Sequence, residues 1–137
     1  MTVYMDTNIF VYWLTAHPIH GGIAKKKLVE AVEAGETAIT SALSIVQIDW
    51  AMGALLKARM IGEYDPNKMV ESVMGIQNLR IVELNGSICK RALKHVKKYG
   101  LELEDAIHLE TALRHNCREI FSADADFDRS PLKRRFK

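Results

Sequence analysis

The chain has 137 residues, of which 48% are hydrophobic and 26% charged, and its formal net charge is +2. This composition is ordinary for a globular protein, and the length predicts one domain, over residues 1–137, with a proper hydrophobic core. Neither a signal-peptide pattern, nor an apolar run of about 18 residues, nor a closely spaced cysteine pair is present, so we expect a cytoplasmic protein without a membrane span or disulfide framework.

The first half of the chain predicts two strands and two helices. In chain order these are a strand over 2–5, a helix over about 7–14, a helix over about 23–34 and a strand over 37–40. Asp6 or Thr7 is a suitable cap for the first helix, and Gly35 is a suitable end for the second. His17-Pro18 breaks the helical pattern between them.

The second half predicts four helices and two strands. In chain order these are a helix over 44–59, a helix opened by Asp65-Pro66, a strand over 79–84, helices over 87–99 and 103–115, and a strand over 119–122. The first of these helices is apolar almost all the way round, so we expect both its sides to be covered, within the fold or at an oligomer interface. Strands that alternate with helices predict a parallel α/β sheet.

Carboxylates stand where the first and last predicted strands end. Asp6 follows the first strand, Asp124 and Asp126 follow the last, and Asp105 lies in the first turn of a helix, where the helix dipole should favour its ionised form. Ligands of open α/β sheets bind beyond the carboxyl ends of the strands. Because clustered carboxylates repel one another, we expect a hard divalent cation such as Mg²⁺ at this edge.

Four short motifs follow one another along nearly the whole chain. They are Met5-Asp6-Thr7-Asn8, then Ser41-Ala42-Leu43-Ser44, then Leu103-Glu104-Asp105-Ala106-Ile107-His108 with Thr111-Ala112, and finally Ile120-Phe121-Ser122-Ala123-Asp124-Ala125-Asp126-Phe127. In this arrangement the chain resembles the PIN-domain nucleases, especially the small VapC-like toxin ribonucleases of prokaryotic toxin–antitoxin pairs. The resemblance implies a three-layer α/β/α fold with a central parallel sheet of about four to five strands.

The resemblance also implies an activity, a cofactor and partners. It implies a Mg²⁺- or Mn²⁺-dependent endoribonuclease in which Asp6, Asp105 and Asp124 ring the metal, with Asp126 holding a second ion or its water. The expected partners are an RNA substrate, an antitoxin protein and a second copy of the chain. Four further residues are expected to orient the carboxylates or their waters: Thr7, Asn8, Gln47 and Ser122.

Gln47 departs from the family's pattern, in which an acid follows the turn serine, here Ser41, by six residues. An amide can accept a hydrogen bond but brings no negative charge. Asp49 lies about 200° further around the helix and should face away from the site. The predicted site is therefore one charge short, which leaves open an alternative function: a catalytically weak or inactive PIN module that binds RNA or a protein partner.

Phosphoryl transfer to a strand-end aspartate is a third hypothesis, on the pattern of haloacid-dehalogenase-like phosphatases or response-regulator receivers. Those phosphatases need a second aspartate two residues after the nucleophile, and this chain has Asn8 there. Receivers need an acidic pair before the acceptor strand and a lysine after a late strand, and neither is evident. We therefore rank this hypothesis far below the other two.

Basic and aromatic residues give weaker signals. Lys133, Arg134 and Arg135 crowd the C-terminal end and are candidates for RNA contacts, against the simpler interpretation of a solvated tail. Trp13 and Trp50 are assigned either to the core or to a homodimer interface.

Overall fold

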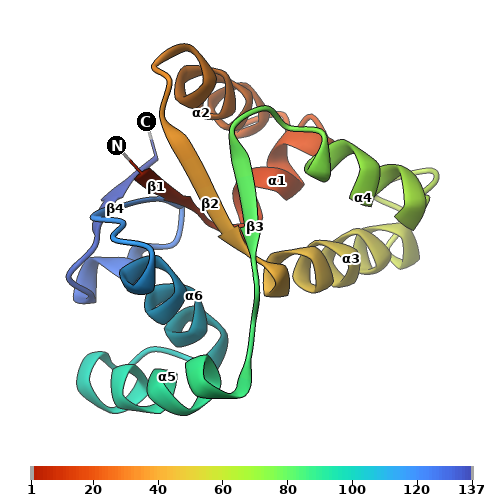
Figure 1. The fold of residues 1–137 in the computed structure, drawn as a ribbon. Coiled ribbons are helices and arrows are strands. Elements are labelled where there is room, and N and C mark those ends of the chain that lie inside the picture. The colour runs from red at the N-terminus through yellow and green to blue at the C-terminus, as the bar shows by residue number, and fades with distance from the viewer. Residues whose placement is uncertain (1, 137) are drawn as a thin grey trace.

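Five parallel strands form one sheet at the centre of the fold (Figure 1). The computed structural model describes residues 2–136, without the side chains of residues 31 and 32. The strands are β1 (Thr2–Met5), β2 (Thr37–Ser41), β3 (Leu79–Val82), β4 (Glu119–Phe121) and β5 (Lys133–Arg135). Their order across the sheet is β3-β2-β1-β4-β5, so that β1 is central.

Helices cover both faces of this sheet, which gives the predicted three layers. The α-helices are α1 (Thr7–Leu14), α2 (Gly21–Glu33), α3 (Ala42–Lys57), α4 (Pro66–Met74), α5 (Gly86–Tyr99) and α6 (Leu103–Arg114), and a short 3-10 helix, η1, covers Ala125–Arg129. Figure 1 shows α5 and α6 on one side of the sheet, and α1 with its neighbours on the other. None of the helices described for this chain is long and apolar enough to cross a membrane.

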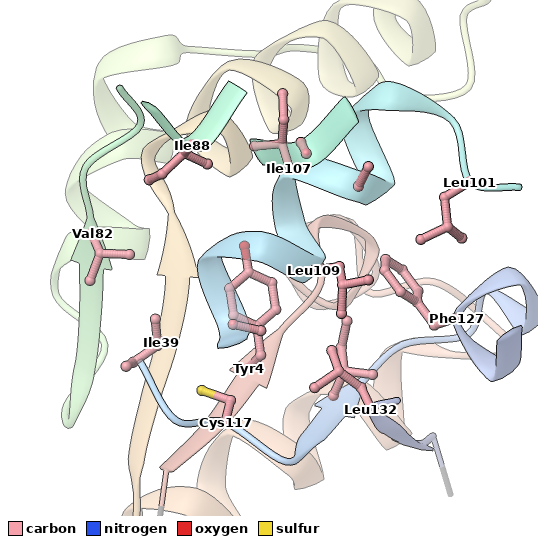
Figure 2. Packing of buried hydrophobic residues seen from close by; sticks show 14 residues of the cluster. Tyr4, Ile39, Val82, Ile88, Leu101, Ile107, Leu109, Cys117, Phe127 and Leu132 are labelled. Carbon is pink, nitrogen blue, oxygen red and sulfur yellow. The ribbon is translucent and has the colours of Figure 1, made fainter. Parts of the chain in front are cut away.

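The side-chain alternation of β1 divides the core into two clusters. Val3 and Met5 point into a cluster built with α1, α2, α3 and α4, whereas Tyr4 points into a cluster built with α5, α6 and η1. Figure 2 shows the second cluster around Tyr4, Leu109 and Phe127, all of which are fully buried. A parallel sheet buried on both faces explains why β1 is apolar along its length rather than alternating with polar residues.

One interpretation of the sequence was wrong, and another is met only in part within the fold. The basic segment Lys133–Arg135 is not a tail: it forms β5, an edge strand paired with β4. Of the two alternatives for α3, coverage within the fold is incomplete, because Val46, Trp50 and Leu56 are 49%, 66% and 38% exposed; coverage at an oligomer interface stays a prediction. Apolar periodicity shows which residues avoid water, but it does not show whether the same chain covers them.

Candidate metal centre

A pocket lies beyond the carboxyl ends of the central strands, and it collects most of the predicted site residues. It is lined by Asp6, Thr7, Asn8, Gln47, Trp50, Ala51, Glu102, Glu104, Asp105, His108 and Asp124. The parallel register pairs Met5 of β1 with Phe121 of β4, and the Asp6 backbone N–H donates to the Phe121 carbonyl at 3.1 Å. Asp6 and Ser122, the next residues in each strand, are therefore brought side by side.

Asp6 forms the buried floor of this pocket, where it is 6% exposed. Its Oδ1 accepts from the Thr7 backbone N–H at 2.8 Å, which caps α1, and its Oδ2 accepts from the Ser122 hydroxyl at 2.6 Å. The capping role and the position in the pocket therefore occur together in one residue. Because both oxygens are held, the orientation of the carboxylate is fixed.

Three other carboxylates converge near Asp6, which is not itself a member of their group. One oxygen from each of Asp105, Asp124 and Asp126 lies within 4.8 Å of the other two. Asp124 is fixed by its backbone N–H, which donates to Ser122 Oγ at 3.0 Å, and by its Oδ1, which accepts from the Asp126 N–H at 2.9 Å. Ser122 thus links the Asp6 carboxylate to the loop that carries the other two aspartates.

The surroundings of Asp105 oppose its ionisation, contrary to the expectation from the helix dipole. Burial, followed by the negative charges of Asp6, Asp124 and Asp126, raises the pKa of Asp105 from 3.8 to about 7. These effects outweigh the helix dipole, which the sequence alone suggested would keep the carboxylate ionised. The same acidic field, added to burial, raises the pKa of Tyr12, with Asp6 and Asp124 as the charges responsible.

The carboxylates suit a divalent cation because little else neutralises them. Asp6, Asp105 and Asp124 form no ion pair with the basic residues of the described chain, and only Asp126 has one, with Arg129 at 3.4 Å. Hard oxygen ligands and uncompensated negative charge are what Mg²⁺ and Mn²⁺ require. The negative charges of Asp6 and Asp124 help to raise the pKa of Asp105, and a bound cation would neutralise them.

Gln47 reaches the pocket from α3, but its side-chain oxygen is already bonded. Its Oε1 accepts from Thr7 Oγ1 at 2.7 Å and contacts His108 Nε2 at 2.6 Å. His108 is 1% exposed, and its Nδ1 bonds the Tyr4 hydroxyl. His108 is therefore packed in the core and also belongs to a buried polar network.

The remaining predicted residues lie around the pocket or away from it. Asn8 is exposed at the pocket wall. Asp49 faces away, as expected from the helix geometry, and accepts from the Tyr64 hydroxyl at 2.7 Å. Arg134 pairs with Asp128 and also donates from Nη1 to the Ser122 carbonyl at 3.2 Å, Arg135 pairs with Glu119, and Lys133 is exposed. None of the three is among the residues that line the pocket.

Sequence reasoning missed several residues that line the pocket. Glu102 and Glu104 both precede Asp105 in the chain and add two exposed carboxylates to the pocket. Trp50 lies one helical turn after Gln47. The spacing of Trp50 from Gln47, three residues apart on one helix, was a signal available in the sequence. The bond from His108 to Tyr4 joins residues 104 apart and had no such signal.

Comparison with solved structures supports the fold. The chain superposes on VapBC2 from Rickettsia felis bound to a promoter DNA fragment, with TM-score 0.69, 16% identity and 98% of each chain covered. It also superposes on VapC20 from Mycobacterium tuberculosis, a sarcin-ricin loop cleaving toxin, with TM-score 0.70, 15% identity and 92% of each chain covered. A toxin–antitoxin complex from Klebsiella pneumoniae gives TM-score 0.62 at 22% identity, with 96% of this chain and 98% of that chain covered.

No curated protein sequence matches the chain significantly. The family comparison is decisive instead, because the model of the PIN domain matches residues 3–131. This match covers the four motifs, the residues that line the pocket, strands β2, β3 and β4, and β1 from Val3 onward. The chain therefore belongs to the PIN domain family.

Proposed function

We propose that this chain is a divalent-metal-dependent endoribonuclease, a single PIN domain over residues 1–137 that acts in the cytoplasm as the toxin of a toxin–antitoxin pair. The observation that carries the proposal is the convergence of Asp105, Asp124 and Asp126 within 4.8 Å, beside the buried Asp6. Membership of the PIN family and the fold shared with a sarcin-ricin loop cleaving toxin support it.

Mg²⁺ or Mn²⁺ is the proposed cofactor, held by Asp6, Asp105, Asp124 and Asp126, of which the last three converge within 4.8 Å. When bound, such an ion supplies an activated water nucleophile and neutralises charge on the phosphoryl oxygens. The residues of the chain prepare the site for it. Ser122 and the Thr7 N–H hold the Asp6 carboxylate in one orientation, and a bound cation would lower the pKa of Asp105 from its raised value of about 7.

An antitoxin is the proposed protein partner. The structures that share this fold include a VapBC2 complex and a toxin–antitoxin complex. An apolar hollow lined by Trp13, Leu28, Val29 and Ile76, with Lys25 at its side, offers a surface that a partner could cover.

A homodimer is proposed through the uncovered face of α3. Val46, Trp50 and Leu56 expose large apolar side chains there, and such patches commonly mark protein contacts. Sedimentation at two concentrations, with Val46→Glu as the variant, tests this. A monomeric wild-type chain at both concentrations would contradict it.

The basic strand β5 is proposed as a weak RNA contact. Lys133 is exposed and available to a phosphate, whereas Arg134 and Arg135 would have to exchange their carboxylate partners for phosphates. Binding through such residues should weaken as salt rises. The test compares the RNA affinity of Lys133→Gln with that of Arg135→Gln, each measured at two salt concentrations.

A catalytically weak PIN module that binds RNA or a protein is the second candidate. The observation that favours it is Gln47, which brings an amide rather than a carboxylate to the pocket. This candidate predicts RNA binding without cleavage by the wild-type chain, and cleavage by Gln47→Glu.

A cleavage assay on a mixed RNA pool tests the main proposal. Metal-free protein is titrated with Mn²⁺ or Mg²⁺, alongside Asp6→Asn and Asp105→Asn, with Asp128→Asn as a control outside the pocket. We expect cutting that requires the ion and is lost in the first two variants only. Cutting that persists in both variants, or after removal of the metal, would overturn the proposal.

A further inference from the structure

The oxygen of the Gln47 amide already has two hydrogen-bond partners. A carbonyl oxygen has two lone pairs, and Oε1 lies 2.7 Å from the Thr7 hydroxyl and 2.6 Å from His108 Nε2. Since Gln47 also lines the acidic pocket, its NH₂ group is the polar group that remains for a ligand there. A glutamine held in this way offers the pocket a donor and not an acceptor.

The network behind Gln47 fixes this orientation. The Tyr4 hydroxyl oxygen accepts from the Ser41 backbone N–H at 3.2 Å, so its hydrogen is free to be donated to His108 Nδ1. We assign the Tyr4 hydrogen to this bond, which gives the neutral imidazole of His108 with its own hydrogen on Nε2, facing Gln47 Oε1. Burial lowers the pKa of His108, which agrees with this neutral form. Reversing the amide would place its NH₂ against the Nε2–H of His108.

The charges of the rest of the pocket explain why an N–H donor would help to bind an anionic substrate. Five carboxylates line the pocket, at Asp6, Glu102, Glu104, Asp105 and Asp124, and no lysine or arginine of the described chain is among the lining residues. A phosphodiester entering this pocket meets repulsion except at a cation and at neutral N–H donors. Donors that are fixed in advance stabilise developing charge without reorganisation.

We propose that the Gln47 side chain donates a hydrogen bond to an anionic oxygen of the RNA phosphodiester in this pocket, with Thr7 and His108 as positioning residues that hold its amide. This inference rests on the proposed ribonuclease function and names how that site receives its substrate. Gln47 then acts on the phosphate and not on the ion. A carboxylate at this position would face the phosphate with a negative charge.

Two variants separate the donor from the other roles of the side chain. Gln47→Glu keeps the length and both accepted hydrogen bonds but replaces the NH₂ with an oxygen. Gln47→Met keeps the approximate length and removes donor and acceptor together. For each variant, Mn²⁺ affinity is measured without RNA by calorimetry, and the dissociation constant of a labelled RNA oligonucleotide is measured at saturating Mn²⁺, followed by cleavage kinetics.

The donor role predicts that both variants bind and cleave RNA more weakly, by roughly 10- to 100-fold, which is the usual effect of a lost hydrogen bond to a charged group. Mn²⁺ affinity, measured without RNA, should stay within about twofold in Gln47→Met, because an N–H donor is not a ligand for a cation. RNA binding by Gln47→Glu equal to wild type would assign Gln47 a purely structural role. Faster cleavage by Gln47→Glu, or loss of Mn²⁺ binding in Gln47→Met, would overturn the proposal.

His108→Leu tests the positioning part. Without the Nε2–H the amide can rotate, so RNA binding should weaken while Mn²⁺ affinity is retained; unchanged RNA binding would remove His108 from the proposal. Asp49→Asn, on the opposite side of α3, is the control and should match wild type. If wild type cleaves no RNA in Mn²⁺, the nuclease function fails, yet the RNA dissociation constants still decide the donor role.

Discussion

Ser122 donates its hydroxyl hydrogen to Asp6 Oδ2 at 2.6 Å, and so joins two residues that are 116 positions apart in the chain. The bond exists because β1 and β4 are parallel neighbours in register, so that the residue after each strand arrives at the same place. Ser122 Oγ also accepts from the Asp124 N–H at 3.0 Å. One hydroxyl thus organises two of the carboxylates in the pocket.

Ser122→Ala should therefore lower both stability and metal affinity. The variant leaves Asp6 Oδ2 buried without its donor, which costs about 1–3 kcal/mol of unfolding free energy. Urea unfolding measures the stability, and Mn²⁺ titration measures the affinity. Ser72→Ala, at an exposed position on α4, is the matched control. Equal stability of the two variants would contradict the role given to Ser122.

Asp105 should make the metal-free protein less stable as the pH rises. Its pKa is raised in the folded state from 3.8 to about 7, so the folded chain holds the proton more tightly than the unfolded chain. Its contribution to stability is fully present below pH 3.8 and is lost as the pH rises through about 7. In chelator, Asp105→Asn should gain stability relative to wild type across this window. A constant difference between them from pH 4 to pH 8 would speak against the raised pKa.

A divalent ion should stabilise the fold through the three converging carboxylates. Binding to the native state alone raises stability with ligand concentration, and at about 100 times the dissociation constant the gain is about 2.7 kcal/mol. We expect Mn²⁺ to raise the melting temperature of wild type, and to raise that of Asp124→Asn much less. Asp128→Asn, two residues beyond Asp126, loses only an exposed ion pair with Arg134 and should respond like wild type. An equal response of all three proteins would place the ion elsewhere.

Glu110 should matter for stability rather than for activity. It joins α6 to α5, with Oε2 accepting from Arg114 Nε at 2.6 Å and Oε1 lying 2.9 Å from His95 Nε2. Burial acts to raise the pKa of Glu110, but the bonds to Arg114 and His95 outweigh it and lower the pKa below 4.5. Its stabilising contribution is present above pH 4.5 and is lost as the pH falls through the lowered pKa.

Glu110→Gln should accordingly cost about 1–3 kcal/mol at neutral pH, as for other hydrogen bonds to charged groups, and the difference should shrink in acid. Cleavage by the folded variant should equal that of wild type. Glu71→Gln, on the exposed side of α4, serves as the control. A cost that persists unchanged at low pH would show that the charge of Glu110 is not what stabilises the helix pair.

The order of the elements up to β4, and the residues that could carry chemistry, were predictable from local sequence patterns. Asp6 could be identified as a helix cap and as a site residue because both signals are local: a polar residue follows an apolar strand and precedes a helix. The boundaries of β1, α1 and α5 were predicted to within a residue. The PIN assignment, confirmed by the family model, followed from motifs that are short and contiguous.

Features that depend on contacts between distant segments could not be predicted in this way. The raised pKa of Asp105 results from charges contributed by Asp6, Asp124 and Asp126, so no property of its own helix could reveal it. Likewise, β5 exists because β4 offers an unpaired edge; the segment 133–135 is basic and carries no apolar signal of a strand. His108 and Gln47, 61 residues apart, meet only after α3 and α6 have both docked. Sequence patterns show which residues of a segment avoid water, whereas the distances between segments arise only when the chain folds.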